Sequence, residues 1–429
     1  MDPTRTPSAR APRRGLTRRR ALAAGTAVLG ALCLPACSPF RTTRSGSDFV
    51  FTLWGTGNEL KAVEQIVDEA ASAAGLTAIT QSTPVNYETK MNTLIAANTP
   101  PDAGYLTEAH SMRLGEQGRL LNVVGLEPFD RFMPQALHWY TPEAAVPQTC
   151  QESMTLFYDA DAAAEAGVTV PTRVDEAWSW DELVEAADLL TIDDEGRHPS
   201  EDGFNASAVQ RYGFAVPGGA QPLHNLLSSR GVEMYDAEGT RCLLDSAEAI
   251  EVVQALADLV NVHRVSPTPA QAATYGANAS LLLQSGRVAM VIEGTWSLLD
   301  LSTSGVNYDV GALPVLDHYA MTTTSGASAV FSASSHQDFG VQLLSDFADP
   351  VRSTLYSSGL WMPAIKDYYT DEDRIASWTS TGAHPAGFRE AVVDAVVEHG
   401  VPYPSYRIKN YTTIQTLIIN ALGPMVTNG

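Results

Sequence analysis

The feature that most constrains this chain is a regular alternation of apolar strands and amphipathic helices in its N-terminal part. Residues 49–54 (FVFTLW) predict a first strand, and residues 59–74 predict a helix because their apolar side chains keep a helical spacing. Strands are predicted next at 76–81 and 103–106, with a helix at 87–97 between them. Strands and helices of this length in alternation predict a doubly wound α/β fold.

In a doubly wound sheet, ligands lie beyond the carboxyl ends of the strands. Aromatic and polar side chains follow those ends here, and we expect them to face a binding cleft. Aromatic rings pack on apolar ligand faces, while carboxylates, amides and hydroxyls bind ligand hydroxyl groups. The candidate ligand-binding residues at this edge are Trp54, Thr56, Asn58, Glu59, Tyr87 and Glu108.

Residues 286–316 continue the pattern further along the chain. Five apolar residues at 288–292 predict a buried strand, and the glycine of Glu293-Gly294-Thr295 allows a sharp turn before Trp296. Trp296 then stands at a helix start, beside backbone N–H groups that have no partner within the helix. One aromatic face beside several donors suits a neutral, hydroxyl-rich ligand, although the sequence is equally compatible with a core anchor.

Length and charge narrow the function classes. At 429 residues the chain exceeds one ordinary hydrophobic core, so two lobes or domains are expected. Its net charge of −22 argues against binding of nucleic acid, which needs a basic surface. Residues 1–36 hold seven Arg and one Asp, so the remainder carries a net charge of −28. A strongly acidic body behind a basic leader is typical of an exported protein.

The basic leader contains two recognisable motifs. Residues 17–22 (TRRRAL) resemble a twin-arginine export signal, and the apolar run that follows is too short for a transmembrane helix. Leu34-Pro35-Ala36-Cys37 resembles a lipobox, in which the cysteine receives the lipid. We therefore predict a signal peptide at 1–36, lipidation of Cys37 and a flexible tether over 37–47. An ordinary secretory signal with an incidental cysteine is the alternative.

Few residues indicate chemistry other than binding. The sequence contains no CxxC or HExxH spacing, no P-loop and no GxSxG motif, so no metal, cofactor or catalytic residue is predicted. A glycosidase-like pair among the many carboxylates stays open. The acidic segment 193–204 lacks the spacing of a calcium-binding loop and is interpreted as a solvated hairpin. Folding before export favours free, mostly buried thiols at Cys150 and Cys242, although an oxidising compartment would allow a disulfide between them.

Several motifs are shared with one protein family. The pattern G-x-x-A-M-x-x-x-G-x-W over 286–296 is followed by Leu-Pro-Val-Leu at 313–316, and Asn-Thr-Pro-Pro-Asp at 98–102 precedes a predicted strand. Residues 146–159 (VPQTCQESMTLFYD) are similar to a strand that crosses between two lobes. From about residue 49 to its C-terminus, the chain resembles the family 1 extracellular solute-binding proteins. These are the maltose-binding-protein-like receptors of ABC importers.

The resemblance implies a periplasmic-binding-protein-like fold, in which two discontinuous, doubly wound lobes surround a ligand cleft and are joined by a hinge. Lobe 1 is expected to comprise 48–150 and 318–366, and lobe 2 to comprise 151–317 and 367–429. The resemblance also places further residues at the cleft, on the crossing strand and in the loops that follow later strands. These are Glu152, Gly218, Gln221, Trp296, Gly326 and Trp361.

The function implied by the resemblance is binding and transport rather than catalysis. We expect a receptor that captures a sugar, and more specifically an oligosaccharide, by hinge closure and delivers it to the permease subunits of an ABC importer. Cys37 would anchor it to the outer face of the cell membrane, and no nucleic acid would be a partner. A receptor for a non-sugar solute, such as a polyol or a peptide, and a secreted carbohydrate-active enzyme are the alternatives.

Overall fold

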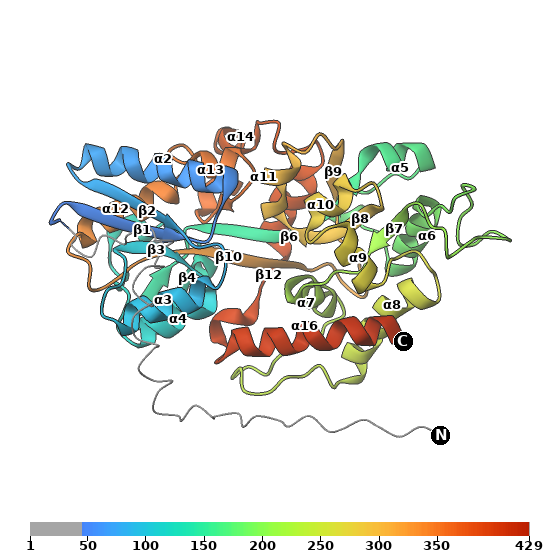
Figure 1. The fold of residues 1–429 in the computed structure, drawn as a ribbon, viewed down its shortest axis with the longest axis horizontal. Helices are drawn as coiled ribbons and strands as arrows, with labels where there is room; N and C mark the ends of the chain where they lie inside the picture. Colours follow the sequence, from blue (N-terminus) through green and yellow to red (C-terminus); the bar gives the residue numbers. More distant parts are fainter. Residues whose placement is uncertain (1–44, 429) are drawn as a thin grey trace, which may run out of the picture. The chain divides into compact units, whose positions relative to one another are not determined.

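Strands and helices alternate along the N-terminal part of the folded chain, as the sequence predicts (Figure 1). The computed structural model describes residues 45–428, so the predicted signal peptide, Cys37 and most of the tether lie outside the described residues. Residues from Ser47 onward form one compact unit, and the lobe boundaries given above stay a prediction. Within 45–428, no helix is both long and apolar enough to cross a membrane.

The first three strands form a parallel set at one end of a ten-stranded sheet. The elements of this part are β1 (Asp48–Leu53), α2 (Gly57–Ala73), β2 (Thr77–Ser82), α3 (Tyr87–Ala96), β3 (Ala103–Leu106) and α4 (Glu108–Glu116). Figure 1 shows α2 above these strands and α3 and α4 below them. All six residues of β1 are buried, which is expected for a strand covered on both faces.

Two ten-residue strands, β6 (Cys150–Asp159) and β10 (Met321–Val330), join this parallel set to the rest of the sheet. β10 runs antiparallel to β3 on one side and to β6 on the other. β6 continues beside β8 (Val288–Gly294), which is parallel to β7 (Tyr212–Ala215). The order β2-β1-β3-β10-β6-β8-β7 therefore places the two long strands at the centre of the sheet.

Short strands and further helices complete this architecture. β9 (Tyr308–Gly311) and β11 (Met362–Pro363) pair with β6, and β12 (Gly400–Pro402) pairs with β10. The remaining α-helices are α5 (Ala160–Ala166), α6 (Trp180–Leu190), α7 (Ala220–Ser229), α8 (Ala247–Asn261), α9 (Pro269–Tyr275), α10 (Ala279–Gln284), α11 (Leu298–Leu301), α12 (Gln337–Phe347), α13 (Thr354–Ser357), α14 (Glu372–Thr379), α15 (Ala395–His399) and α16 (Tyr411–Asn428). In Figure 1, α7 and α16 lie below the second part of the sheet, and α10 and α11 lie above it.

The C-terminal segment first returns to the parallel set and then ends in the other part of the fold. After β12, the 3₁₀ turn η7 (Pro404–Arg407) lies against α4. There the Ser405 hydroxyl donates a hydrogen bond to the Glu108 carboxylate. Thr412 Oγ1 donates to Glu88 at 3.3 Å, and α16 then packs along α8. The segment thus connects elements that are far apart in the sequence.

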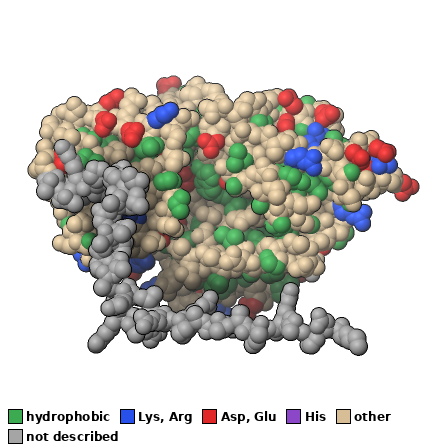
Figure 2. Space-filling model, in the orientation of Figure 1, with side chains coloured by type: hydrophobic (Ala, Val, Ile, Leu, Met, Phe, Trp, Pro, Cys, Tyr) green, Lys and Arg blue, Asp and Glu red, His purple; other side chains and the backbone are tan. Residues whose placement is uncertain are grey.

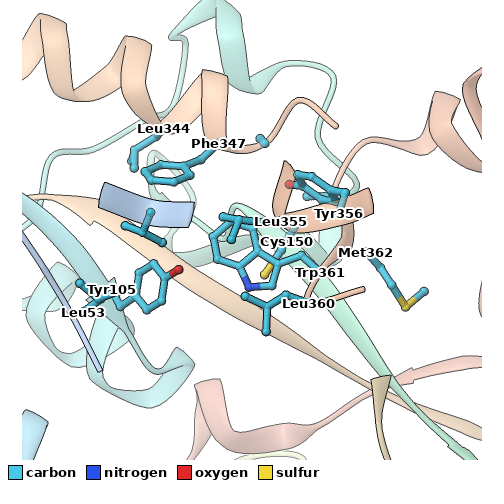
Figure 3. Close-up of a cluster of buried hydrophobic side chains, with 14 of the residues drawn as sticks. Leu53, Tyr105, Cys150, Leu344, Phe347, Leu355, Tyr356, Leu360, Trp361 and Met362 are labelled. Atoms are coloured by element: carbon cyan, nitrogen blue, oxygen red, sulfur yellow. The ribbon is translucent and has the colours of Figure 1, made fainter. Parts of the chain in front are cut away.

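Two hydrophobic cores pack against the sheet. The first contains Trp361, whose ring lies 5.8 Å from that of Tyr105, 5.9 Å from Phe347 and 6.0 Å from Tyr356 (Figure 3). The second joins β7 and β8 to α6, α7 and α8. Each fully buried large apolar side chain in these cores stabilises the fold by about 1.5–3 kcal/mol. Trp296 contacts both cores and so lies where they meet.

Two parts of the structure differ from simple sequence expectations. The helical segment that ends at His399 is not a regular α-helix, because it consists of a π-helix at Arg389–Asp394 followed by α15. The hairpin of β4 (Leu137–Thr141) and β5 (Ala144–Pro147) has no turn dipeptide that predicts it. It forms because its buried β5 residues pack below the sheet beside α4.

The acidic segment at 193–204 is a loop organised by one buried carboxylate. Asp193 accepts hydrogen bonds from the backbone N–H groups of Glu195, Arg197 and Asn205 at 2.8–2.9 Å, and from Arg197 Nε at 2.9 Å. Burial raises the pKa of Asp193, but these donors together bring it below its ordinary value. The loop therefore satisfies its central carboxylate with its own donors.

Candidate functional site

A cavity of about 210 Å³ lies where the two long strands meet the start of α4 and the turn η7. We call it the central cavity. Its lining residues come from β10, which contributes hydroxyl-bearing side chains, from β6 and from the hairpin strand β4. The side chains that give it chemical character are Glu108, His138, Trp139, Gln151, Ser325 and Tyr406. It thus combines one carboxylate, one amide, hydroxyls and three aromatic rings.

Glu108 is the most highly connected of these side chains. Thr107 caps α4 by accepting a hydrogen bond from His110 N at 3.3 Å, which places Glu108 in the first helical turn. Glu108 Oε1 accepts from the backbone N–H of Ser325 at 2.9 Å and from its hydroxyl at 2.7 Å, and Oε2 accepts from Ser405. Burial outweighs these bonds and raises the pKa of Glu108 to about 7.

Glu152 and Glu59 form an acidic group with Glu108. The pKa of Glu152 is raised to about 8, mainly by burial and in addition by the charges of Glu59 and Glu108. A hydrogen bond from Thr324 Oγ1 at 3.3 Å partly opposes this shift. Burial also raises the pKa of Glu59 to about 7; the Tyr105 hydroxyl opposes this shift. No ion pair of the described residues includes any of the three carboxylates. The middle of the site is therefore acidic without a compensating cation.

Gly326 is placed opposite Cys150 in the pairing of β10 with β6. A Cβ atom on Gly326 would lie 2.2 Å from Cys150 Sγ, so this position admits only glycine while the thiol is there. Cys150 and Trp361 belong to the same cluster of buried side chains (Figure 3). Both cysteines are free thiols, as the sequence favoured; Cys150 is buried as expected, but Cys242 is exposed, so the expected burial is wrong for Cys242.

Three of the predicted aromatic residues lie in one packed cluster. The ring of Trp54 is 5.4 Å from that of Tyr87 and 5.0 Å from that of Tyr105, which in turn contacts Trp361. The Tyr87 hydroxyl donates to the backbone carbonyls of Thr52 at 3.1 Å and Tyr105 at 2.8 Å. Tyr87 and Trp361 are buried, at 7% and 5% exposure, whereas Trp54 is partly exposed. Of these three residues, Trp54 is therefore the most exposed to solvent.

Trp296 follows β8 in a 3₁₀ turn, close to the helix start that the sequence predicts. Its indole N–H donates to Glu293 Oε1 at 3.3 Å. The ring folds back over Gly294, where a Cβ atom would lie 2.1 Å from it. The glycine before Trp296 therefore provides room for the ring, and Trp296 stays partly exposed at the contact of the two cores.

The remaining predicted residues lie at the surface. Thr56 and Asn58 are exposed at the start of α2, and Thr56 makes no side-chain capping bond. Gly218 is exposed before α7, and Gln221 is partly exposed in its first turn. Among all the predicted residues, Glu108 alone is part of the central-cavity lining. The structure thus brings together the acidic group and the aromatic cluster, but it leaves these four residues apart from the cavity.

The family resemblance placed Gln151 with Glu152 at a polar cleft position of the crossing strand, but sequence reasoning missed three other residues that line the cavity: His138, Trp139 and Tyr406. Gln151 directly precedes Glu152 on the crossing strand. Because successive side chains of a strand point to opposite faces of the sheet, these two side chains face opposite sides. The other three lie in the β4 hairpin and η7, whose positions depend on contacts between distant segments. Among the described residues, no group of three or more His, Cys, Asp or Glu side chains is arranged to hold a metal ion.

The family is decided by a comparison with protein-family models. Residues 59–348 match the model of the bacterial extracellular solute-binding proteins. The chain belongs to this family. No curated protein matches the sequence. Membership in this extracellular solute-binding family makes the chain a binding protein that acts outside the cytoplasm.

Solved structures similar to this solute-binding protein share its fold at low sequence identity. An ABC substrate-binding protein from Listeria monocytogenes, in complex with cycloalternan, has a TM-score of 0.73 at 19% identity, with 88% of this chain and 93% of that chain covered. UspC of M. tuberculosis has a TM-score of 0.66 at 22% identity, with coverages of 89% and 96%. The maltose-maltodextrin binding protein of Alicyclobacillus acidocaldarius has a TM-score of 0.68 at 15% identity, with coverages of 89% and 95%. The predicted maltose-binding-protein-like fold is confirmed.

Proposed function

We propose that this protein is a lipid-anchored receptor that captures a sugar in a cleft between two lobes and delivers it to the permease of an ABC importer. One observation carries the sugar assignment: the central cavity combines aromatic rings, a buried carboxylate and a buried amide at the two long strands. The similar structures named with cycloalternan and with maltose and maltodextrin support the same ligand class.

The lining chemistry of the central cavity fits a hydroxyl-rich ring. Gln151 is only 3% exposed, and its Nε2 finds no hydrogen-bond partner among the described residues. An unpaired buried donor costs free energy, which a ligand oxygen would recover. The Tyr406 ring, 5.1 Å from that of His138, offers an apolar face to the C–H side of a sugar. The repulsion among the carboxylates disfavours sugars that carry phosphate or carboxylate groups.

We divide the predicted residues by the roles that their positions support. Glu108 is proposed to contact the sugar in the central cavity. Trp54, Glu59, Glu152 and Trp296, which are not part of the cavity lining, are proposed to contact the sugar or its bound water when the lobes close. Tyr87, Gly326 and Trp361 are proposed to position them, because the first and third are buried and the second accommodates a thiol. Thr56, Asn58, Gly218 and Gln221, at the starts of α2 and α7, are proposed to reach the ligand when the cleft closes.

Hinge closure is the proposed capture mechanism. The long strands β6 and β10 pair with strands of both parts of the sheet, and we assign the hinge to them. Lobe 1 would comprise 48–150 and 318–366, and lobe 2 would comprise 151–317 and 367–429. A ligand favours the closed form only through contacts that it makes with both lobes at once. Glu108 on one side and Trp296 on the other are the residues proposed for these two contacts.

The export route and the anchor complete the proposal. A twin-arginine signal would export the folded protein. Acyl chains on Cys37 would then hold it at the outer face of the cell membrane, because each buried CH₂ group contributes about 0.8 kcal/mol of binding free energy. Metabolic labelling with a fatty-acid analogue tests the anchor. Label is expected in the full chain and is expected to be absent when Cys37 is replaced by Ser.

Sugar binding is tested on protein that begins at Ser38, with a thermal-shift screen of mono- and oligosaccharides, polyols and peptides. A ligand at about 1,000 times its Kd stabilises the folded state by roughly 4 kcal/mol. Trp296→Ala and Gln151→Ala are expected to remove the shift, whereas Ile250→Ala, an exposed position on α8, should retain it. Stabilisation by a polyol or a peptide, with no response to any sugar, would contradict the sugar assignment.

A further inference from the structure

The acidic group of Glu59, Glu108 and Glu152 lies where segments of both proposed lobes meet. Glu108, on α4 of lobe 1, accepts a hydrogen bond from the Ser405 hydroxyl in the C-terminal segment of lobe 2. Burial raises the pKa of Glu59 on α2 of lobe 1, and the charge of Asp300 on α11 of lobe 2 raises it further. Glu152 belongs to β6, one of the two strands to which we assign the hinge. The three carboxylates are therefore placed to respond to a movement of the lobes.

The groups that face these carboxylates bring no positive charge. His138 Nε2 lies 3.0 Å from the Ser325 hydroxyl, which donates to the acidic group. α4 also carries His110 and Arg113, but both side chains pair with Asn92 on α3. Among the described residues, no Arg or Lys contributes to the pKa shifts of the three carboxylates. The other titratable groups that interact with them electrostatically are Tyr105, Cys150, Asp300, Tyr403 and Tyr411.

Burial without a nearby cation favours the protonated, neutral form of a carboxyl group. It is the largest cause that raises the pKa values of Glu59 and Glu108 to about 7 and that of Glu152 to about 8. If the lobes moved apart, water would reach the carboxyl groups, and their pKa values would return toward the ordinary 4.5. The arrangement described here thus binds protons that an opened arrangement releases. Its stability relative to the opened one is full at low pH and is lost as the pH rises through 7 to 8.

The hydrogen bond between the lobes does not itself require a charged carboxylate. The Ser405 hydroxyl can donate to ionised Glu108 and can accept from its protonated form. Protonation therefore keeps this contact and removes the repulsion within the acidic group. Ionisation also keeps the contact, but it leaves several like charges in a buried place, which is costly.

We propose that the acidic group is a pH-sensitive switch between the lobes: in acidic medium its carboxyl groups are protonated and hold the arrangement described here, and in neutral to alkaline medium their ionisation favours an opened arrangement. A protein that acts outside the cytoplasm experiences the pH of the medium directly. This inference rests on the proposed lobes and hinge, and it does not depend on which ligand the protein binds.

Pulsed electron paramagnetic resonance between two spin labels tests the switch on the chain from Ser38, without ligand, between pH 5.5 and pH 8.5. One label is attached to Cys242, the exposed native thiol in lobe 2, and the other to Val85→Cys, a position in lobe 1 that is 71% exposed. Cys150 is buried and stays unlabelled in the folded protein. The ratio of the described to the opened arrangement should fall by about tenfold or more over this range, because one pKa unit of linkage corresponds to a factor of ten. Small-angle scattering of the unlabelled protein provides a second measurement.

Substitutions assign the effect to the acidic group. The double variant with Glu108→Gln and Glu152→Gln has lost two of the three titrating groups, so it should keep most of the described arrangement at pH 8.5. Each single variant should lose part of the pH dependence, which keeps the test valid if the double variant does not fold. Glu248→Gln is the matched control, since this residue also stands in the first turn of a helix but is exposed. It should follow wild type.

The outcomes separate this inference from the proposed function. A ratio that stays constant with pH in wild type, or a double variant that changes in parallel with wild type, would overturn the switch and leave the sugar assignment intact. Conversely, a flat response in the thermal-shift screen of sugars would leave the switch intact. If wild type keeps one arrangement at every pH and also with a ligand from that screen, the proposed hinge fails, and the switch fails with it.

Discussion

Glu108→Gln is the substitution for which the structure gives the clearest magnitude. The pKa of Glu108 is raised from 4.5 to about 7 in the folded protein. The folded state thus binds this proton more tightly than the unfolded state, so the free energy of unfolding falls as pH rises from about 4.5 to 7 and is level above that range. At about 1.4 kcal/mol per pKa unit, the ionised carboxylate costs about 3 kcal/mol of stability above neutral pH. The amide cannot ionise, so the variant avoids this cost.

The amide should also keep the local hydrogen bonds. Its oxygen can accept from Ser325, and its NH₂ group can donate to the Ser405 hydroxyl, which both contact the carboxylate in the wild type. Removing the charge of Glu108 also removes its repulsion of the Glu152 carboxylate, which further stabilises the folded variant relative to wild type at high pH. The stability of the variant relative to wild type should therefore increase by about 3 kcal/mol between pH 5 and pH 8.

Urea unfolding followed by tryptophan fluorescence at pH 5, 6, 7 and 8 measures this difference. Glu248→Gln, at an exposed position in the first turn of α8, is the matched control and should follow the wild-type profile. If Glu108→Gln and wild type lose stability in parallel as the pH rises, the carboxylate does not titrate in the folded state as its burial requires. The electrostatic description of the site would then be incorrect.

Three further substitutions test the packing and hydrogen bonds around the site. Gly326→Ala should destabilise the fold by about 1–3 kcal/mol because of the clash with the Cys150 thiol. In thermal unfolding, the double variant with Cys150→Ala should recover most of this loss, and no recovery would refute the clash. Tyr87→Phe should lower stability by about 1 kcal/mol through the loss of its hydroxyl bonds without changing sugar affinity in calorimetry, and a large affinity loss would instead make it a ligand contact. Asp193→Ala should lower stability by about 3 kcal/mol because four donors lose their acceptor, while EDTA should leave the unfolding temperature of the wild type unchanged; a shift with EDTA would indicate a bound cation.

Periodic patterns in the sequence predict the fold well because they reflect local physics. The alternation of apolar runs and amphipathic stretches locates β1, α2 and β3 to within a few residues, and the apolar run before Trp296 locates β8. The π-helix at Arg389–Asp394 and the hairpin that carries Trp139 leave no such pattern. Their backbone conformations depend on tertiary packing that the local sequence does not encode.

The candidate site was less predictable for the same reason. The strand-end argument selects Glu108, which lines the central cavity, because the carboxyl end of β3 is fixed by local sequence. Tyr406 reaches that cavity, and Ser405 reaches Glu108, only because η7 returns to α4, across nearly 300 residues. Nothing in the residues around them indicates this return. Likewise, the exposure of Tyr87 and Trp361 depends on neighbours from distant segments, which bury both rings.

The return of the C-terminal segment has a consequence for the synthesis of the protein. Glu108 and Ser405 are 297 residues apart, and Glu88 and Thr412 are 324 apart. A nascent chain leaving the ribosome thus exposes the face of α4 that η7 later covers until nearly all of the chain has emerged. Contacts of such long sequence separation form slowly, because the chain loses the entropy of closing a long loop before the contacts stabilise it. This face of α4 therefore stays uncovered through most of translation, and it is completed only when the last residues of the chain have emerged.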